Sequence, residues 1–257
     1  MVLKSRDNPR VRRWRELARD AALRRSEGSA ILEGAHLVDA FLRSGGKPRA
    51  LLVDEAAQSE SEVARLVAAA GIAPIVVSKS VLKAIADAET PPALVAEVPI
   101  REAKLDPARW RRCVLLDAIQ DAGNVGAILR SAAAFGLEDV VLGAGCADAW
   151  SPKVLRAAQG GHFALRIARS NDLAQALAGF SGAVLGTVPR GGRLLAECDL
   201  AGRIAWLFGS EGQGLAPRLL EHVTARVRIP MAEGAESLNV AAAAAVCFYE
   251  GARGRSK

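Results

Sequence analysis

Short apolar runs alternate with amphipathic stretches along almost the whole chain. In the first hundred residues, the apolar runs predict four strands, at 30–32, 51–53, 75–77 and 94–98. Apolar residues at three- and four-residue spacing predict the helices between them, over 34–42, 61–70 and 80–86. A longer helix is predicted from Asn8 to about Arg25, because Val11, Trp14 and Leu17 fall on one face. This block is therefore expected to form a small α/β unit.

The same alternation continues from Cys113 to the end of the chain. About six strands are predicted, at 113–116, 140–143, 162–167, 182–188, 204–208 and 226–230. Helices are predicted between and after them, over 120–136, 151–158, 173–177 and 237–250. Parallel strands joined by helices form an open sheet whose ligands bind at the carboxyl ends of the strands. The fold class is therefore α/β, with a domain at 1–100, a charged linker at 101–112 and a second domain at 113–257.

Composition narrows the functional classes. Of the 257 residues 51% are hydrophobic, but no apolar stretch reaches the roughly 18 to 20 residues of a membrane span. The basic N-terminus is not followed by an apolar segment, so we expect no secretory signal and a cytoplasmic protein. The four scattered cysteines predict free, buried thiols. His36 and His162 have no ligand partner at a suitable spacing, so packing roles are favoured and no metal is expected.

Positive charge is concentrated at the N-terminus. Residues 1–25 contain nine lysines or arginines and three acids, which accounts for the whole net charge of +6. A basic arm on a neutral body is typical of proteins that contact phosphate backbones. The candidate RNA-binding residues are Arg6, Arg10, Arg12, Arg13 and Arg15. An ordinary solvated helix is the alternative, and Trp14 is expected to anchor the arm rather than stack on a base.

Three loops of the second domain carry polar residues among glycines. In the first, Gly123 and Gly126 are expected to let the strand-to-helix loop turn around Asn124, ahead of Arg130. The second, 209–214, lacks the glycine order of a dinucleotide site and the Gly-Lys-Ser/Thr of a P-loop, so its sequence does not favour classical nucleotide binding. Its carboxylate, Glu211, is expected to be buried and either to bind neighbouring amides or to place a cationic ligand.

The third loop, 229–239, precedes the closing helix. Ser237 is expected to be the N-cap of that helix, with Asn239 in its first turn. Taken one loop at a time, a scaffold role explains the first loop as well as a binding site does, and for Ser237 and Asn239 ordinary capping is favoured.

Taken in chain order, the three loops resemble the motifs of one family. The motifs are Asn124-Val-Gly-Ala-Ile-Leu-Arg130, Leu207-Phe-Gly-Ser-Glu-Gly-Gln-Gly-Leu215, and Ile229-Pro-Met231 with Glu236-Ser-Leu-Asn-Val240. Residues 113–250 resemble the SpoU (TrmH-like) branch of the SPOUT RNA methyltransferases. Residues near Asn8-Pro9 and 31–38 resemble the L30e-like RNA-binding domain of many members. Ala122 and Ala241 depart from the usual motifs without removing a side chain of assigned chemical role.

The resemblance implies a fold and a reaction that periodicity cannot predict. It implies a mostly parallel SPOUT sheet with a deep trefoil knot, a homodimer, and S-adenosylmethionine as cofactor. The implied cofactor residues are Thr187, Gly209, Ile229 and Leu238. The implied catalytic residues are Arg130, Asn124, Glu211, Ser237 and Asn239, acting on a ribose 2′-hydroxyl. Arginine is a poor base, so Arg130 is alternatively expected to bind a phosphate or the developing oxyanion.

The substrate is expected to be structured RNA, with 23S ribosomal RNA favoured over tRNA. A catalytically inactive RNA-binding protein and a Rossmann-type oxidoreductase are the other hypotheses. The intact polar residues argue against the first, and the missing dinucleotide motif argues against the second. Housekeeping and antibiotic-resistance methyltransferases of this family share the same domain plan, and both are retained as hypotheses.

Overall fold

The computed structural model describes residues 2–253, and the chain divides into two compact units. The first unit comprises the chain up to Arg101 together with Asp148–Phe163. The second comprises Glu102–Ala147 and the chain from Ala164 onward. The first unit is therefore built from two separate stretches of sequence.

The first unit is a four-stranded mixed sheet with helices on both faces. Its strands are β1 (Ser29–Glu33), β2 (Ala50–Asp54), β3 (Ile75–Val77) and β4 (Leu94–Pro99), in the order β1-β4-β2-β3. Strand β4 runs antiparallel to β1 and β2, whereas β2 and β3 are parallel. The helices are α1 (Pro9–Arg19), α2 (Ala21–Glu27), α3 (Ala35–Arg43), α4 (Ser61–Ala70) and α5 (Lys79–Ile85). The predicted four strands are confirmed.

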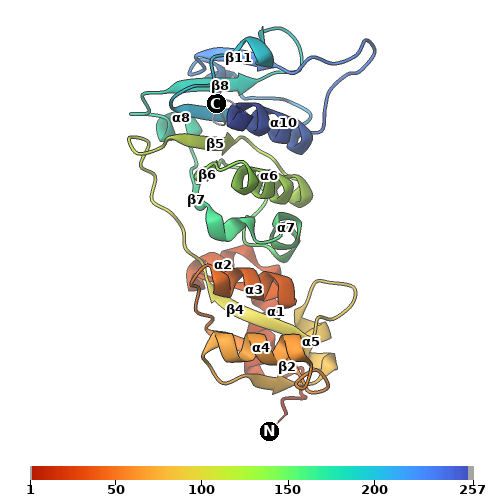
Figure 1. Ribbon diagram of the computed structural model, residues 1–257. Helices are drawn as coiled ribbons and strands as arrows, with labels where there is room; N and C mark the ends of the chain where they lie inside the picture. The colour runs from red at the N-terminus through yellow and green to blue at the C-terminus, as the bar shows by residue number, and fades with distance from the viewer. Residues whose placement is uncertain (1, 254–257) are drawn as a thin grey trace. The chain divides into compact units, whose positions relative to one another are not determined.

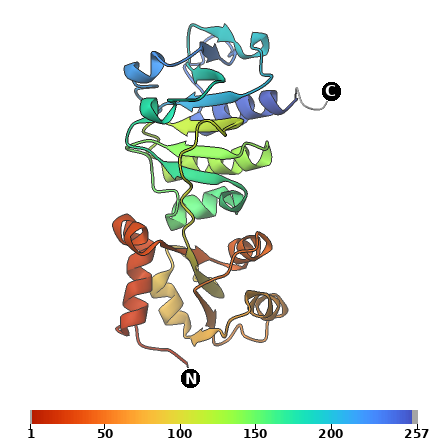
Figure 2. The ribbon, with the colours of Figure 1, turned by 90° about the vertical axis from the view of Figure 1, so that its left-hand side faces the viewer.

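Two hydrophobic clusters hold this sheet between its helices. One contains Val11, Trp14 and Leu17 of α1 with residues of α5, and the other contains residues of α3 and α4. Figure 2 shows α1 and α5 on one side of the sheet and α3 and α4 on the other. Because alternate residues of a strand face opposite ways, β1, β2 and β4 each supply both clusters, whereas β3 supplies only the cluster with α1 and α5. All residues of β1 and β2 are buried.

Helix α7 (Pro152–Ala158) completes the first unit although it lies far along the chain. Leu155 is buried in the same cluster as α3 and α4. Arg156 donates to Glu33 Oε2 (2.9 Å), and the buried Arg24 donates to Asp148 Oδ2 (2.8 Å). The segment is therefore attached by apolar packing and by two charged hydrogen-bonded pairs.

The single helix predicted from Asn8 to Arg25 is wrong, because Asp20 divides it in two. The amide of Asp20 ends α1 by donating to the Glu16 carbonyl (2.7 Å). The Asp20 carboxylate then caps α2 by accepting from the amides of Ala22 (2.7 Å) and Leu23 (3.3 Å). Aspartate favours such a cap because its short side chain competes for backbone donors.

The second unit is a seven-stranded sheet in which every neighbouring pair is parallel. Its strands are β5 (Arg112–Leu116), β6 (Asp139–Leu142), β7 (Arg166–Arg169), β8 (Ala183–Thr187), β9 (Arg193–Leu194), β10 (Ile204–Phe208) and β11 (Ala225–Arg228). Their order is β7-β6-β5-β10-β8-β11-β9. The predicted α/β class with a mostly parallel sheet is therefore confirmed.

Helices cover both faces of this sheet. They are α6 (Ala122–Ala134), α8 (Leu173–Ala176), α9 (Pro217–Leu220) and α10 (Val240–Arg253), and a 3-10 turn lies at Leu195–Glu197. Helices α6 and α10 pack side by side, as Figure 1 shows. Residues of α8 and α9 belong to a separate cluster with Trp110 and residues of β5 and β10. The sheet core is therefore closed on two sides, while its strand ends remain available for loops.

The strand predicted over 162–167 is wrong in its first half. Gly161–Ala164 forms a 3-10 helix, and β7 begins only at Arg166. His162 is buried there, with its Nε2 2.6 Å from the Ala149 carbonyl oxygen, while Nδ1 has no partner among the described residues. Burial lowers the pKa of His162 to about 4, so it is neutral at physiological pH. Its packing role is as expected, whereas His36 is exposed.

The cysteines are free in the part of the chain that the structure describes. Cys113 and Cys247 are buried, and burial raises the pKa of Cys247 to about 12. Cys146 and Cys198 are only partly buried, so the expectation of burial holds for two of the four. No helix within residues 2–253 is long and apolar enough to cross a membrane. No group of three or more potential metal ligands lies within the same range.

Candidate active site

The strand order of the second unit brings the three motif loops together. Strand β10 lies between β5 and β8, with Leu207 opposite both Leu115 and Gly186, and β11 pairs with β8 on its far side. Parallel strands end at the same edge of a sheet. The loops that follow β5, β10 and β11 therefore meet at one edge, although Asn124 lies 87 residues before Glu211 and Asn239 lies 28 residues after it.

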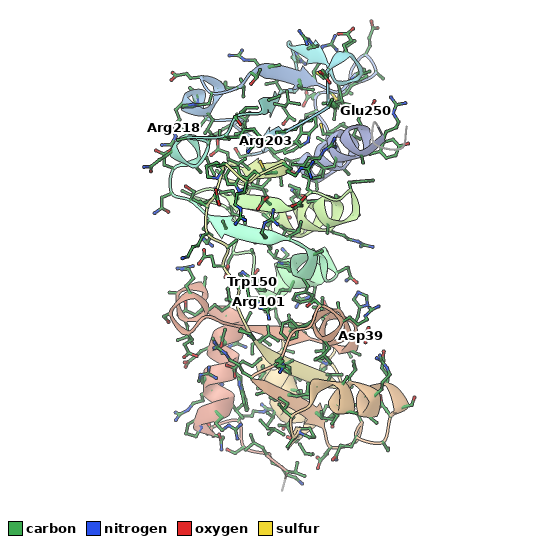
Figure 3. The ribbon with its side chains drawn as sticks, turned by 60° about the vertical axis from the view of Figure 1, so that its left-hand side comes forward. Asp39, Arg101, Trp150, Arg203, Arg218 and Glu250 are labelled. Atoms are coloured by element: carbon green, nitrogen blue, oxygen red, sulfur yellow. The ribbon has the colours of Figure 1, made fainter. Side chains whose placement is uncertain are left out.

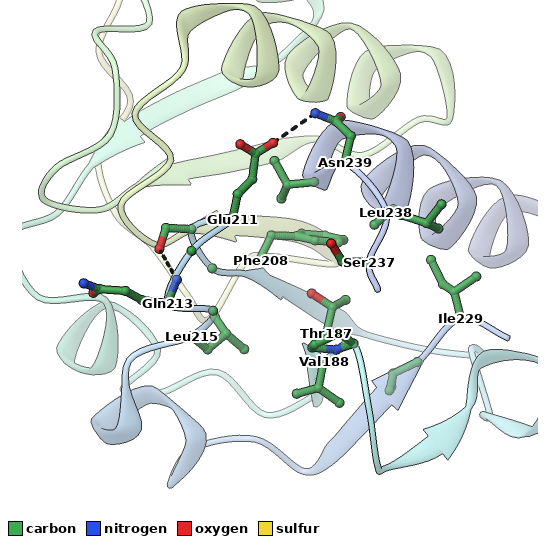
Figure 4. A pocket seen from close by; sticks show the side chains of 18 of the residues that line it. Thr187, Val188, Phe208, Glu211, Gln213, Leu215, Ile229, Ser237, Leu238 and Asn239 are labelled. Atoms are coloured by element: carbon green, nitrogen blue, oxygen red, sulfur yellow. Dashed lines mark hydrogen bonds between the residues drawn. The ribbon is translucent and has the colours of Figure 1, made fainter. Parts of the chain in front are cut away.

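One polar residue from each loop joins a hydrogen-bonded triangle. Asn124 Nδ2 donates to Glu211 Oε1 (2.7 Å). Asn239 Nδ2 donates to Asn124 Oδ1 (2.9 Å) and to Glu211 Oε1 (3.0 Å), the latter drawn in Figure 4. Both asparagine side chains donate through Nδ2, Asn124 also accepts through Oδ1, and the Glu211 carboxylate oxygen accepts two hydrogen bonds. These hydrogen bonds hold together three loops that are separated by whole strands and helices in the sequence.

Asn124 lies in the first turn of α6, and the predicted glycine-mediated turn around it is wrong. Asp121 is the N-cap and accepts from the Asn124 amide (2.8 Å). Gly123 and Gly126 both lie within the helix. A Cβ on Gly123 would lie 2.9 Å from Asp121 Oδ1, so the glycine leaves room for the cap rather than for a turn.

Asn239, not Ser237, caps the closing helix. Its Oδ1 accepts from the amides of Ala241 (2.9 Å) and Ala242 (3.2 Å), and α10 begins at Val240. The two ends of the Asn239 amide thus have separate tasks: the oxygen starts the helix, and the nitrogen joins the triangle. A serine at 237 is equally suited to capping, so sequence alone did not separate the two positions.

Glu211 is exposed, so the expectation of a buried carboxylate is wrong. It stands on the loop 209–214, which folds back on itself through a hydrogen bond from the Gly214 amide to the Ser210 carbonyl (2.8 Å). A Cβ on Gly209 would lie 2.0 Å from the Gly214 carbonyl carbon. Only glycine therefore allows the two ends of the loop to approach this closely.

A cavity of about 660 Å³ opens beside the triangle (Figure 4). All four predicted cofactor residues line it: Thr187, Gly209, Ile229 and Leu238. Sequence reasoning missed other lining residues, among them Val188, Phe208, Leu215, Met231 and Val240. Most of these residues directly adjoin a predicted site residue in the sequence, so their position next to it could have indicated that they line the cavity.

The cavity fits the cofactor that the resemblance implies. Its volume falls within the range of about 300–1,000 Å³ that is usual for small-molecule sites. Apolar side chains such as Phe208 and Leu215 can contact an adenine ring, and the backbone of Gly209 can approach it without a side chain between them. Thr187 donates to the Leu207 carbonyl (3.0 Å), which ties the ends of β8 and β10 beneath the cavity.

The remaining two predicted catalytic residues lie outside the triangle. Ser237 lines the cavity and forms no hydrogen bond with the described residues. Arg130 does not line it and is exposed on α6, and its side chain has no hydrogen bond or ion pair within residues 2–253. Six residues of helix separate Arg130 from Asn124 by about 9 Å along the axis and by about a third of a turn. Arg130 is therefore free to contact a substrate.

The five candidate RNA-binding arginines differ in their surroundings. Arg6, Arg10 and Arg12 are exposed, and Arg15 is half-buried. Arg13 instead forms ion pairs with Glu97 (2.8 Å) and Glu27 (2.5 Å), and the hydrogen bond with Glu97 is the main reason its pKa is raised.

Glu97 joins the helix to the sheet of the first unit. Trp14 Nε1 donates to Glu97 Oε2 (2.8 Å), so Trp14 anchors α1, as favoured from the sequence. Burial opposes ionisation of Glu97, but hydrogen bonds from Arg13, Trp14 and Ser29 outweigh it and lower its pKa. Arg13 and Trp14 therefore hold a buried carboxylate in place.

Comparison with known proteins matches both units. The SpoU rRNA Methylase family model matches residues 111–249, and the MRM3-like substrate binding domain matches residues 8–96. The 23S rRNA (guanosine(2553)-2′-O)-methyltransferase RlmP of Bacillus subtilis is 35% identical, covering 96% of this chain and 97% of the relative.

Two solved structures are similar over nearly the whole length of the chain. An AdoMet-bound rRNA methyltransferase from Sinorhizobium meliloti has a TM-score of 0.86 at 29% identity, covering 99% of this chain and 98% of that one. The SpoU methyltransferase AviRb from Streptomyces viridochromogenes, in complex with AdoMet, has a TM-score of 0.86 at 26% identity, covering 97% and 99%.

The fold, the site and these similarities define the class of the protein as an S-adenosylmethionine-dependent RNA 2′-O-methyltransferase, as predicted. Within that class, the chain belongs to the SpoU rRNA methylase family, whose model matches more than half of its length. The SPOUT fold expected for the second unit is confirmed by the same structures.

Proposed function

We propose that this protein transfers the methyl group of S-adenosylmethionine to a ribose 2′-hydroxyl in 23S ribosomal RNA. The observation that carries the proposal is the triangle of Asn124, Glu211 and Asn239, which joins all three motif loops at the edge of the cavity. Ribosomal RNA is favoured over tRNA because the full-length relative from Bacillus subtilis is named for a 23S rRNA nucleotide.

Methyl transfer from a sulfonium is a displacement in line with the attacking oxygen, so alignment and exclusion of water matter more than a strong acid. When bound, S-adenosylmethionine supplies the electrophilic methyl group. Thr187, Gly209, Ile229 and Leu238 would hold it in the cavity, and the triangle would keep the loops in register beside it. Ser237 has its hydroxyl available for the substrate or cofactor.

The 2′-hydroxyl must lose its proton as the new bond forms. Arg130 is exposed on α6, and an arginine side chain offers hydrogen-bond donors but no acceptor for a proton. We assign it the binding of the target phosphate or of the developing negative charge on oxygen. Replacement by alanine is then expected to abolish methyl transfer while S-adenosylmethionine binding persists.

RNA binding by the first unit is proposed to use Arg6, Arg10, Arg12 and Arg15. Arg6, Arg12 and Arg15 form no ion pair with another described residue, and Arg10 lies with its guanidinium carbon 5.0 Å from the Trp14 ring centroid. Arg13 contributes less, because Glu27 and Glu97 already bind its guanidinium.

We also propose a homodimer formed through helix α10. Ala242, Val246 and Tyr249 recur at helical spacing and form an exposed, largely apolar stripe; Val246 is 41% exposed and Tyr249 is 55% exposed. The Tyr249 ring contacts Phe135 at the end of α6 (centroids 5.9 Å apart). Light scattering should give twice the chain mass for the native protein and a monomer for Tyr249→Asp. A native monomer would contradict the proposal.

Methyl transfer to ribosomal RNA tests the function directly. Purified protein, labelled S-adenosylmethionine and unmodified 23S rRNA transcripts are expected to yield one 2′-O-methylated nucleotide, mapped by its resistance to alkaline hydrolysis. Arg130→Ala serves as the inactive control. Methylation of a base, or methylation of tRNA alone, would refute the proposed substrate.

A further inference from the structure

A second hollow adjoins the cofactor cavity on the side of β11. It encloses about 230 Å³ and shares Pro189, Ile229 and Met231 with the cavity. Arg190 and Arg228 also line it, and no acidic residue does so within the described part of the chain. A hollow with two arginines and no carboxylate is suited to an anion.

The parallel pairing of β8 and β11 places these two arginines together. Thr187 lies opposite Val227, and the Val188 amide donates to the Val227 carbonyl (2.9 Å). Arg228 directly follows Val227, and Arg190 lies two residues after Val188, so both arginines start from the same paired position. Gly192 holds the intervening loop against β11, because a Cβ at its φ of +76° would lie 2.6 Å from the Arg226 carbonyl oxygen.

Positive charge extends beyond the hollow onto β9 and β11, which pair in parallel with Arg193 opposite Val227. Segments 188–194 and 225–231 contain four arginines and no acid: Arg190, Arg193, Arg226 and Arg228. Within residues 2–253, none of their side chains forms a hydrogen bond or ion pair. One carboxylate, such as that of the cofactor, needs a single guanidinium, whereas four unpaired cations favour a polyanion.

We propose that Arg190 and Arg228 bind a phosphodiester of the RNA strand that carries the target ribose. The inference rests on the proposed function, since a ribose presented to the cofactor brings its flanking phosphates with it. Arg193 and Arg226 extend the positive surface, so they could contact further phosphates of the same RNA strand. The second unit thus holds the RNA itself, in addition to the basic helix of the first unit.

Salt-dependent RNA binding tests the assignment. The double variant Arg190→Ala/Arg228→Ala is compared with the native protein and with a control variant, Arg218→Ala. Arg218, labelled in Figure 3, is an exposed arginine of the same unit and lines neither hollow. Binding of a 23S rRNA transcript is measured from 50 to 200 mM KCl. Each lost phosphate contact lowers the slope of log affinity against log salt by about 0.7 to 0.9.

The double variant is expected to lose at least about 0.7 of that slope, with unchanged affinity for S-adenosylmethionine. Arg218→Ala should keep the native slope, and Arg190→Lys/Arg228→Lys should restore it if folding is intact. An unchanged slope in the alanine variant refutes the proposal. Weaker S-adenosylmethionine binding would assign the pair to the cofactor instead, and saturable binding of inorganic phosphate would assign it to a small free anion.

The outcome is separable from that of the proposed function. Methyl transfer by the native protein tests the function, whereas the difference in salt slope between the variants tests the phosphate site. A native protein that methylates 23S rRNA, combined with a double variant of unchanged slope, would overturn only the phosphate site. A native protein that binds RNA without methylating it, with the slope reduced as expected, would overturn only the function.

Discussion

Replacing Gly209 by alanine tests whether the 209–214 loop shapes the cofactor cavity. The new Cβ would lie 2.0 Å from the Gly214 carbonyl carbon and 2.2 Å from the Leu215 amide nitrogen. Both contacts are with backbone, so the loop must move by roughly 1 Å or more, which strains the Gly214 to Ser210 hydrogen bond. Such overpacking costs about 1–3 kcal/mol. If the displaced loop must return for binding, affinity for S-adenosylmethionine falls by roughly 5- to 150-fold.

Gly212 provides a matched control in the same loop. Apart from the two chain neighbours, no atom of residues 2–253 lies within 4 Å of a Cβ on Gly212, so Gly212→Ala should bind S-adenosylmethionine with native affinity. Calorimetric titration of both variants measures the difference, and thermal unfolding verifies that each remains folded. Native affinity in Gly209→Ala would refute the reasoning, as would an equal loss in Gly212→Ala.

Three further predictions concern the triangle and the buried histidine. Asn239→Ala removes the α10 cap and two hydrogen bonds of the triangle, so it should lower the free energy of unfolding by about 1 kcal/mol and abolish methyl transfer. Unimpaired methyl transfer would show that the triangle is not needed for function. Asn239→Asp keeps the oxygen that caps α10 but places a second carboxylate beside Glu211, so it should keep the native melting temperature and lose methyl transfer. An active variant would contradict the need for the Nδ2 donor. Because the pKa of His162 is lowered to about 4 in the folded protein, only the unfolded chain binds this proton between about pH 6.5 and pH 4. The free energy of unfolding should therefore decrease as the pH falls through this range, by at most roughly 3 kcal/mol. Denaturant unfolding at pH 7 and pH 5 should show a smaller decrease for His162→Gln, and equal decreases would refute the assignment.

Much of the secondary structure follows from local sequence. The four strands of the first unit and the strand runs around β5, β8 and β10 were predictable because alternating apolar runs and helical spacing record burial directly. Errors arose where a single polar side chain redirected the backbone. Asp20 ends one helix and begins another, and Asn239 rather than Ser237 starts α10. Serine, asparagine and aspartate can all cap a helix, so only the observed hydrogen bonds distinguish them.

The three motifs identified the family from sequence, but not the geometry of the site. Exposure of Glu211 and the separation of Arg130 from the triangle depend on how the loops pack, which glycine-rich sequence does not specify. The trefoil knot implied by the resemblance stays a prediction. So do the roles of the individual catalytic and cofactor residues, for which the cavity and the triangle provide the test positions.

By itself, the sequence determined the class of fold, the family and the residues worth testing, because these depend on local patterns and on motifs in a recognisable order. Only the tertiary structure decided that β10 lies between β5 and β8, that Asn124, Glu211 and Asn239 share hydrogen bonds, and that Asp148–Phe163 completes the first unit. The physical reason is that strand order and helix attachment depend on contacts between distant residues, whose free energy cannot be inferred from the pattern of either segment alone.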